Sequence, residues 1–219
     1  MKKAVIFDMD GIIFDSERAT YECWMEIAKK YGFASDLDIP YMKCVGVNIR
    51  RCEELFREHY GDSFPFETYR AEESALYHAT YDGGRLPLKP GIREILTRLK
   101  EENYYIAVAS STRSETVKKQ LRDADLLRYF DRVVCGDEVE KSKPAPDIFL
   151  KALEGIDAKV EETCVIEDSY NGIRAAFTAG MIPVMVPDMI PPDDEMREKA
   201  TLIAPDLFAV RDWLVTRGR

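Results

Sequence analysis

Five short apolar runs restrict the fold of this sequence more than any other feature. Each run is rich in valine or isoleucine, is too short to form a helix, and is hydrophobic at consecutive positions. Strands of a parallel sheet have this continuous pattern because both of their faces are buried. The runs lie at residues 4–7, 106–110, 133–135, 164–167 and 182–186.

Helical patterns separate several of these runs. Apolar residues at positions 92, 95, 96 and 99, for example, follow the spacing of an amphipathic helix. Strands that alternate with helices predict an α/β fold, in which helices cover both faces of a doubly wound parallel sheet.

One long segment interrupts this alternation. It contains no convincing strand pattern, and we expect three helices there instead, near residues 17–31, 48–60 and 66–80. We therefore predict that residues 16–87 form an inserted helical domain. Residues 1–15 and 88–219 together would form the α/β core.

Composition restricts the partners and the compartment. The net charge of −9 argues against nucleic acid or an anionic membrane as a partner. Five cysteines without a C-x-x-C pair predict reduced thiols rather than disulfides or a zinc site. No run approaches the length of a transmembrane helix, and Asp8 ends the first run too early for a signal peptide. We expect a soluble cytoplasmic protein and, by default, a monomer.

Acidic pairs mark the ends of two predicted strands. Asp8 and Asp10 follow the first run, while Glu167 and Asp168 close the run at 164–167. Ligands of open parallel sheets bind at the carboxyl ends of the strands, so these side chains are expected to meet at one edge. Clustered carboxylate oxygens suit Mg²⁺, and a cation allows close carboxylates to ionise together. Taken alone, either pair can also be explained by loop or helix-capping roles.

Two further positions suggest a phosphate site. Ser110 and Ser111 stand between a predicted strand and a predicted helix, where hydroxyls and free N–H groups can bind phosphate. Lys143 lies beside Pro144 and Pro146, which stiffen the approach to the next helix. A fixed ammonium can neutralise both phosphate and aspartates. A helix-capping serine and an exposed lysine remain the ordinary alternatives.

Signatures of other enzyme classes are missing. The sequence contains neither G-x-x-x-x-G-K-[ST] nor G-x-S-x-G, and no G-x-G-x-x-G follows a predicted strand. Only two histidines are present, which leaves little for a histidine-based site. P-loop, dinucleotide-binding and serine-hydrolase functions are therefore disfavoured.

Four of these elements, taken together, resemble the four motifs of the haloacid dehalogenase superfamily. They are DMDGI at 8–12, Ser110 after IAVA, Lys143 before PAPDIF, and IEDSYNGI at 166–173. Their order and spacing match along essentially the whole chain. The helical insertion is similar to that of the subfamily containing β-phosphoglucomutase and phosphoglycolate phosphatase. The resemblance implies a Rossmann-like core with an α-helical cap.

The resemblance also implies a role for each core residue. Asp8 would be the nucleophile, which accepts the phosphoryl group as an aspartyl phosphate. Asp10 would be the general acid–base. Ser110, Ser111 and Lys143 would bind the oxygens of the transferring phosphoryl group, with Lys143 also acting in catalysis.

A metal site is implied as well. The Asp8 carboxylate, the backbone carbonyl of Asp10 and Asp168 would bind Mg²⁺, and Glu167 would support the ion directly or through water. In the cap, Thr20 occupies the place of a β-phosphoglucomutase histidine that limits hydrolysis. Arg50 or Arg51, in the predicted cap loop, would contact a distal group of the substrate, although two solvated arginines on a helix are an equal alternative.

We accordingly expect a Mg²⁺-dependent phosphatase that hydrolyses a small phosphomonoester, a metabolite such as a sugar phosphate. The first alternative is a β-phosphoglucomutase-like phosphomutase. The second is a catalytically silent binding protein on the same scaffold. Asp10 argues against dehalogenation, because the superfamily's dehalogenases lack this second aspartate.

Overall fold

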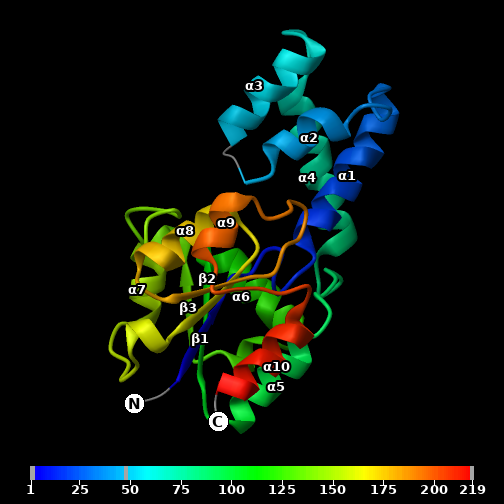
Figure 1. Ribbon diagram of the computed structural model, residues 1–219. Helices are drawn as coiled ribbons and strands as arrows, with labels where there is room; N and C mark the ends of the chain where they lie inside the picture. Colours follow the sequence, from blue (N-terminus) through cyan, green and yellow to red (C-terminus); the bar gives the residue numbers. More distant parts are fainter. Residues whose placement is uncertain (1–2, 47–48, 218–219) are drawn as a thin grey trace. The chain divides into compact units, whose positions relative to one another are not determined.

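The chain forms two compact units. The computed structural model describes residues 3–46 and 49–217. The first unit comprises Met1–Asp15 and Leu88–Arg219, and we call it the core unit. The second, Ser16–Pro87, is the helical unit (Figure 1). Within the described ranges, no helix combines the length and hydrophobicity needed to span a bilayer.

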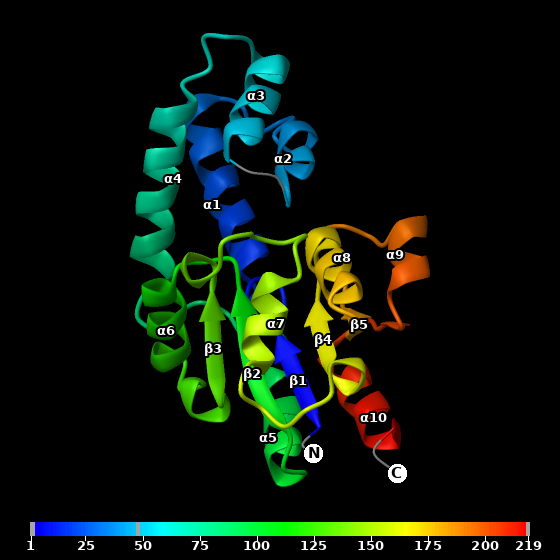
Figure 2. The ribbon, with the colours of Figure 1, turned by 90° about the vertical axis from the view of Figure 1, so that its left-hand side faces the viewer.

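A six-stranded sheet in the order β3-β2-β1-β4-β5-β6 forms the centre of the core unit (Figure 2). Every ladder in it is parallel. The strands are β1 (Ala4–Phe7), β2 (Tyr105–Ser110), β3 (Arg132–Cys135), β4 (Cys164–Glu167), β5 (Ile182–Met185) and β6 (Leu202–Ile203). Phe7 of the central strand is paired with Val108 on one side and Ile166 on the other. The predicted doubly wound α/β fold is confirmed.

All five predicted strands are present, but the sequence did not predict β6. This strand has only two residues, both half-buried, and it pairs with β5 alone. Such a short edge strand has no hydrophobic pattern of its own. Its pairing depends on β5, which tertiary structure places beside it.

Helices lie on both faces of the sheet. Phe149 of α7 and Ala176 of α8 pack against Ile6, Ala107 and Val165 of the sheet in one hydrophobic cluster. Figure 2 shows α7 in front of the strands and α5 behind them. The core-unit helices are α5 (Ile92–Glu101), α6 (Ser114–Asp123), α7 (Asp147–Leu153), α8 (Tyr170–Thr178), α9 (Asp194–Lys199) and α10 (Leu207–Arg217), with 3₁₀ turns η1 (Leu127–Tyr129), η2 (Gly136–Glu138) and η3 (Val160–Glu162).

The helical unit has a separate aromatic core. Its helices are α1 (Ser16–Tyr31), α2 (Asp38–Cys44), α3 (Ile49–Tyr60) and α4 (Phe66–Tyr81). The centre of the Trp24 ring of α1 lies 4.8 Å from the ring centre of Phe56 and 5.1 Å from that of Tyr69. The Tyr69 hydroxyl donates a hydrogen bond to the Trp24 carbonyl. Such aromatic pairs each contribute about 0.5–1.5 kcal/mol beyond the area that they bury.

Three helices of this unit agree with the sequence prediction, whereas α2 was not predicted. Asn48, the first residue of one predicted helix, lies outside the described residues. The helix α2 has seven residues and carries Pro40 in its first turn. Proline usually marks the end of a helical pattern. It is accepted in the first turn because the N–H groups there have no intrahelical partner.

Lys89 ties together three loops of the core unit. Its Nζ lies 2.6 Å from Asp188 Oδ1 and 3.4 Å from Asp15 Oδ1, and its backbone N–H donates to the Ile13 carbonyl at 3.0 Å. Phe14 and Leu88 form an antiparallel bridge next to this ion cluster. The chain therefore leaves the core unit and returns to it at neighbouring positions.

Lys89 provides the counter-charge for the buried carboxylate of Asp188. Its side chain is only 5% exposed, and its Oδ2 has no hydrogen-bond partner among the described residues. We expect Lys89→Met to lower the free energy of unfolding by about 3 kcal/mol, because it leaves a buried carboxylate without its counter-charge. Urea unfolding followed by circular dichroism measures this change.

The matched control is the double variant Lys89→Met/Asp188→Asn. It removes both charges and should recover at least half of the lost stability. A single variant as stable as the wild type would show that Lys89 does not stabilise the core unit.

Candidate active site

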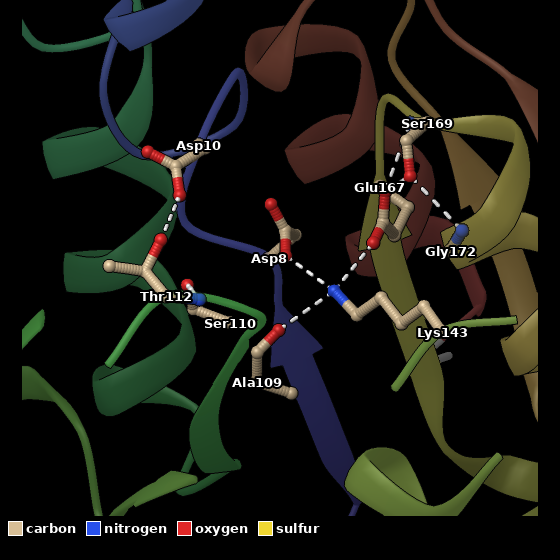
Figure 3. A network of polar contacts seen from close by, with 9 residues as sticks. All are labelled: Asp8, Asp10, Ala109, Ser110, Thr112, Lys143, Glu167, Ser169 and Gly172. Carbon is tan, nitrogen blue, oxygen red and sulfur yellow. Dashed lines mark hydrogen bonds and ion pairs between the residues drawn. The ribbon is translucent and has the colours of Figure 1, made fainter. Parts of the chain in front are cut away.

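The carboxyl ends of β1, β2 and β4 place polar side chains around one point (Figure 3). Asp8 follows β1, and its N–H donates to the Ile166 carbonyl at 2.9 Å, which continues the pairing with β4. Ser110 is the last residue of β2, and Glu167 is the last of β4. Lys143 comes from the segment before α7. Its peptide bond to Pro144 is cis.

The Lys143 ammonium lies at the centre of the cluster. Nζ donates to Asp8 Oδ1 at 2.5 Å, to Glu167 Oε1 at 2.7 Å and to the Ala109 carbonyl at 2.9 Å. These three bonds match the three donors of an ammonium. The side chain is 6% exposed. Burial opposes the charge, but the carboxylates of Asp8 and Glu167 outweigh it and raise the pKa of Lys143 above its ordinary value. Lys143 therefore stays positively charged at neutral pH.

The surroundings of Asp8 disfavour its charged form, whereas those of Lys143 favour the charged ammonium. Burial raises the pKa of its carboxyl group well above the ordinary value, and the neighbouring carboxylates of Glu167 and Asp10 raise it further, while Lys143 lowers it. One ammonium between two buried carboxylates does not fully compensate them. A further cation at this position would favour the ionised form of Asp8.

Glu167 is bonded through both of its carboxylate oxygens. Oε1 accepts from Lys143, and Oε2 accepts from the N–H and the hydroxyl of Ser169, both at 2.9 Å. Ser169 also caps α8, because its Oγ accepts from the Gly172 N–H at 3.0 Å. A Cβ atom at position 172 would overlap the Glu167 carboxyl group. Glycine at this position thus allows Glu167 to lie against the start of α8 and to orient Lys143.

The donor set fits a divalent cation. One carboxylate oxygen from each of Asp8, Glu167 and Asp168 lies within 4.8 Å of the others. Three hard oxygen donors suit Mg²⁺, and the raised pKa of Asp8 indicates the same need for positive charge. Gly11, with φ +74°, makes the turn after β1, and a side chain there would overlap the Asp168 carboxylate. The participation of the Asp10 carbonyl stays a prediction.

The segment after β2 approaches Asp10. The hydroxyl of Thr112 donates to Asp10 Oδ2 at 3.0 Å, and the Thr112 N–H donates to the buried Ser110 Oγ at 3.1 Å. Ser111, which we also predicted to bind phosphate, is exposed. The sequence did not predict the contact of Thr112 with Asp10, because a threonine before a helix gives no signal of its direction.

The three candidate substrate residues of the cap all lie in the helical unit. Thr20 is half-buried on α1. On α3, the Arg50 side chain is 89% exposed, and its Nε lies 3.6 Å from Glu54 Oε1. The Nη1 atom of Arg51 lies 3.0 Å from a carboxylate oxygen of Glu54 and 3.0 Å from one of Glu58. Arg51 is thus ion-paired to glutamates of its own helix. Residues 47 and 48 of the predicted cap loop lie outside the described residues.

Comparison with known proteins identifies the family. The model of the haloacid dehalogenase-like hydrolases matches residues 5–186, which is most of the chain and includes both acidic pairs and Lys143. The chain therefore belongs to the haloacid dehalogenase-like hydrolase family, as its motifs predicted.

Individual relatives include both phosphatases and mutases. The phosphorylated carbohydrates phosphatase of Thermotoga maritima is 33% identical over 179 residues, 82% of each chain. The beta-phosphoglucomutase of Bacillus subtilis is 32% identical over 198 residues, 84% of this chain and 83% of the relative. A crystal structure of a Thermotoga maritima protein has a TM-score of 0.80 and 29% identity, covering 98% of this chain and 99% of the other.

Ser169 provides a test of how the carboxylate at 167 is held. We expect Ser169→Ala to lower kcat/KM about tenfold, because Glu167 loses the hydroxyl that orients it against Lys143. The lost helix cap should also cost about 1 kcal/mol of stability. Steady-state kinetics and urea unfolding measure the two effects.

Asp193→Ala is the matched control. Asp193 caps α9, accepting from the Met196 N–H at 2.8 Å. Its loss should cost similar stability with unchanged kcat/KM. Equal activities of the two variants would contradict a positioning role for Ser169.

Proposed function

We propose that the protein is a Mg²⁺-dependent phosphatase that hydrolyses a small phosphomonoester through an aspartyl phosphate on Asp8. One observation carries this proposal. The Lys143 ammonium lies between Asp8 and Glu167, beside three carboxylate oxygens that lie close enough to share a cation. A carboxylate nucleophile and a positive surrounding are the two requirements for attack on an anionic phosphate.

The first half-reaction forms the phosphoenzyme. A carboxylate oxygen of Asp8 attacks phosphorus while the bond from phosphorus to the leaving oxygen breaks, and Asp10 gives its proton to that oxygen. Lys143, already fixed in the site, reduces the repulsion between the nucleophile and the phosphoryl oxygens. Ser110 and Ser111 would bind the same oxygens.

The second half-reaction releases phosphate. Asp10, now a base, takes a proton from the water that attacks phosphorus, and the Asp8 carboxylate is restored. Bound Mg²⁺, held by Asp8 and Asp168 with Glu167 in support, would supply charge neutralisation to the phosphoryl group. The Asp10 carbonyl would be a further ligand.

The substrate class is proposed from the relatives and from the helical unit. The Thermotoga maritima relative is named for phosphorylated carbohydrates, so we expect a sugar phosphate or a similar small metabolite. Arg50 is the more exposed and more loosely paired of the two candidate arginines, and it is the better candidate for a distal anionic group. Thr20, on α1, would be a further contact of the substrate.

A phosphomutase is the second candidate, supported by the similarity to the Bacillus subtilis beta-phosphoglucomutase. Thr20 stands where we align the histidine that limits hydrolysis in those mutases, and the absence of that histidine favours the phosphatase. The two reactions differ in their products. A phosphatase releases inorganic phosphate, whereas a mutase converts a sugar 1-phosphate only with a bisphosphate primer.

Asp8→Asn tests the nucleophile. We expect loss of at least three orders of magnitude in the hydrolysis of 4-nitrophenyl phosphate, since an amide oxygen cannot form a stable phosphoenzyme. Phosphate release from a metabolite panel, with purified protein and Mg²⁺, measures the same loss on natural monoesters. The exposed Asp125→Asn provides the control and should remain fully active. Near-full activity of Asp8→Asn would disprove the nucleophile assignment.

Metal removal tests the cofactor. We expect EDTA followed by gel filtration to abolish phosphate release and added Mg²⁺ to restore it. Calorimetric titration should detect Mg²⁺ binding to the wild type, and Asp168→Ala should weaken it by at least tenfold. Full activity of the metal-free protein would contradict the proposed cofactor.

A further inference from the structure

The backbone of Thr112 is fixed by hydrogen bonds of both its N–H and its carbonyl group. Its N–H donates to Ser110 Oγ at 3.1 Å, and its carbonyl accepts from the Gly136 N–H at 3.2 Å. Ser110 itself is completely buried at the end of β2. The Thr112 hydroxyl is therefore presented from a fixed piece of backbone rather than from a free loop.

The hydroxyl is directed at Asp10. It donates to Asp10 Oδ2 at 3.0 Å. Figure 3 shows this hydrogen bond, which joins the segment after β1 to the segment after its neighbour β2. A donor with a fixed position restricts rotation of the aspartate about its side-chain bonds, because the hydrogen bond weakens steeply when its geometry is lost.

We infer that Thr112 is the positioning residue of the general acid–base, setting the direction from which Asp10 delivers its proton. This inference rests on the proposed function of Asp10. A proton donor must come within about 2.6–3.2 Å of the atom that receives its proton, so an unrestrained carboxyl group would spend less time in a productive orientation.

The role predicts a dependence on the leaving group. In formation of the phosphoenzyme, the bonding electron pair passes to the leaving oxygen, and the Asp10 proton joins that oxygen. An alkoxide needs this proton, whereas 4-nitrophenolate is stable enough to leave without it. Because kcat/KM covers the steps up to the first irreversible one, it isolates this difference.

The experiment compares Thr112→Val, which keeps the shape and removes the hydroxyl, with Thr112→Ser, which keeps the hydroxyl. The probes are 4-nitrophenyl phosphate and two alkyl monoesters, glucose 6-phosphate and glycerol 2-phosphate. For Thr112→Val we expect kcat/KM to fall about tenfold with the alkyl esters and to change less than twofold with the aryl ester. Thr112→Ser should remain within threefold of the wild type with all three.

Equal losses of kcat/KM with the alkyl and aryl esters would indicate a structural role and would overturn the inference. An unchanged kcat/KM of Thr112→Val with all three esters would overturn it as well. Crystal structures of both variants provide a readout that needs no turnover. The Asp10 carboxyl group should reorient in Thr112→Val and keep its place in Thr112→Ser, and an unmoved Asp10 in the valine variant would overturn the inference. A wild type that hydrolyses none of the three esters would instead contradict the proposed function.

Discussion

The bonds from the Lys143 ammonium to Asp8 and Glu167 are the constraint on which the rest of the site depends. All three side chains are almost fully buried, so water does not solvate their charges and each needs the others. The lysine comes from a loop, whereas the carboxylates come from two strands that pair directly with each other. Its third bond, to the Ala109 carbonyl, attaches this group to a third strand. The fold itself thus fixes the positions of these charges, and electrostatic catalysis depends on charges that are fixed in this way.

Sheet topology explains why these segments meet. The strand order has β1 in the middle, with β2 on one side and β4 on the other. The chain fills one side of β1 first and then the other, which creates a switch point next to β1. Ligands of open parallel sheets bind beside such a point, outside the carboxyl ends of the strands. Asp8 directly follows β1 and Glu167 is the last residue of β4, so the sheet determines where these candidate residues meet.

The sequence predicted the fold class, all five longer strands and the family, because continuous apolar runs and four ordered motifs are local signals. It also predicted that the acidic pairs would meet, since parallel strands share an edge. It did not predict the Thr112 contact with Asp10 or the need for glycine at position 172. Those features depend on where a hydroxyl points and on how closely a carboxylate approaches a helix, and both are decided by tertiary packing. The short elements α2 and β6 were missed for the related reason that packing, rather than pattern, stabilises them.

The bridge between Phe14 and Leu88 has a consequence for how such a chain can change over time. The two ends of the segment between these residues lie side by side. The pairing of β1 with β2 and β4 therefore does not require any particular length of chain between Phe14 and Leu88. Lengthening a closed loop adds little entropic cost, only about 0.6 kcal/mol for each doubling. Natural variation can therefore change the length and sequence of the whole inserted segment while the pairing of the core strands is kept.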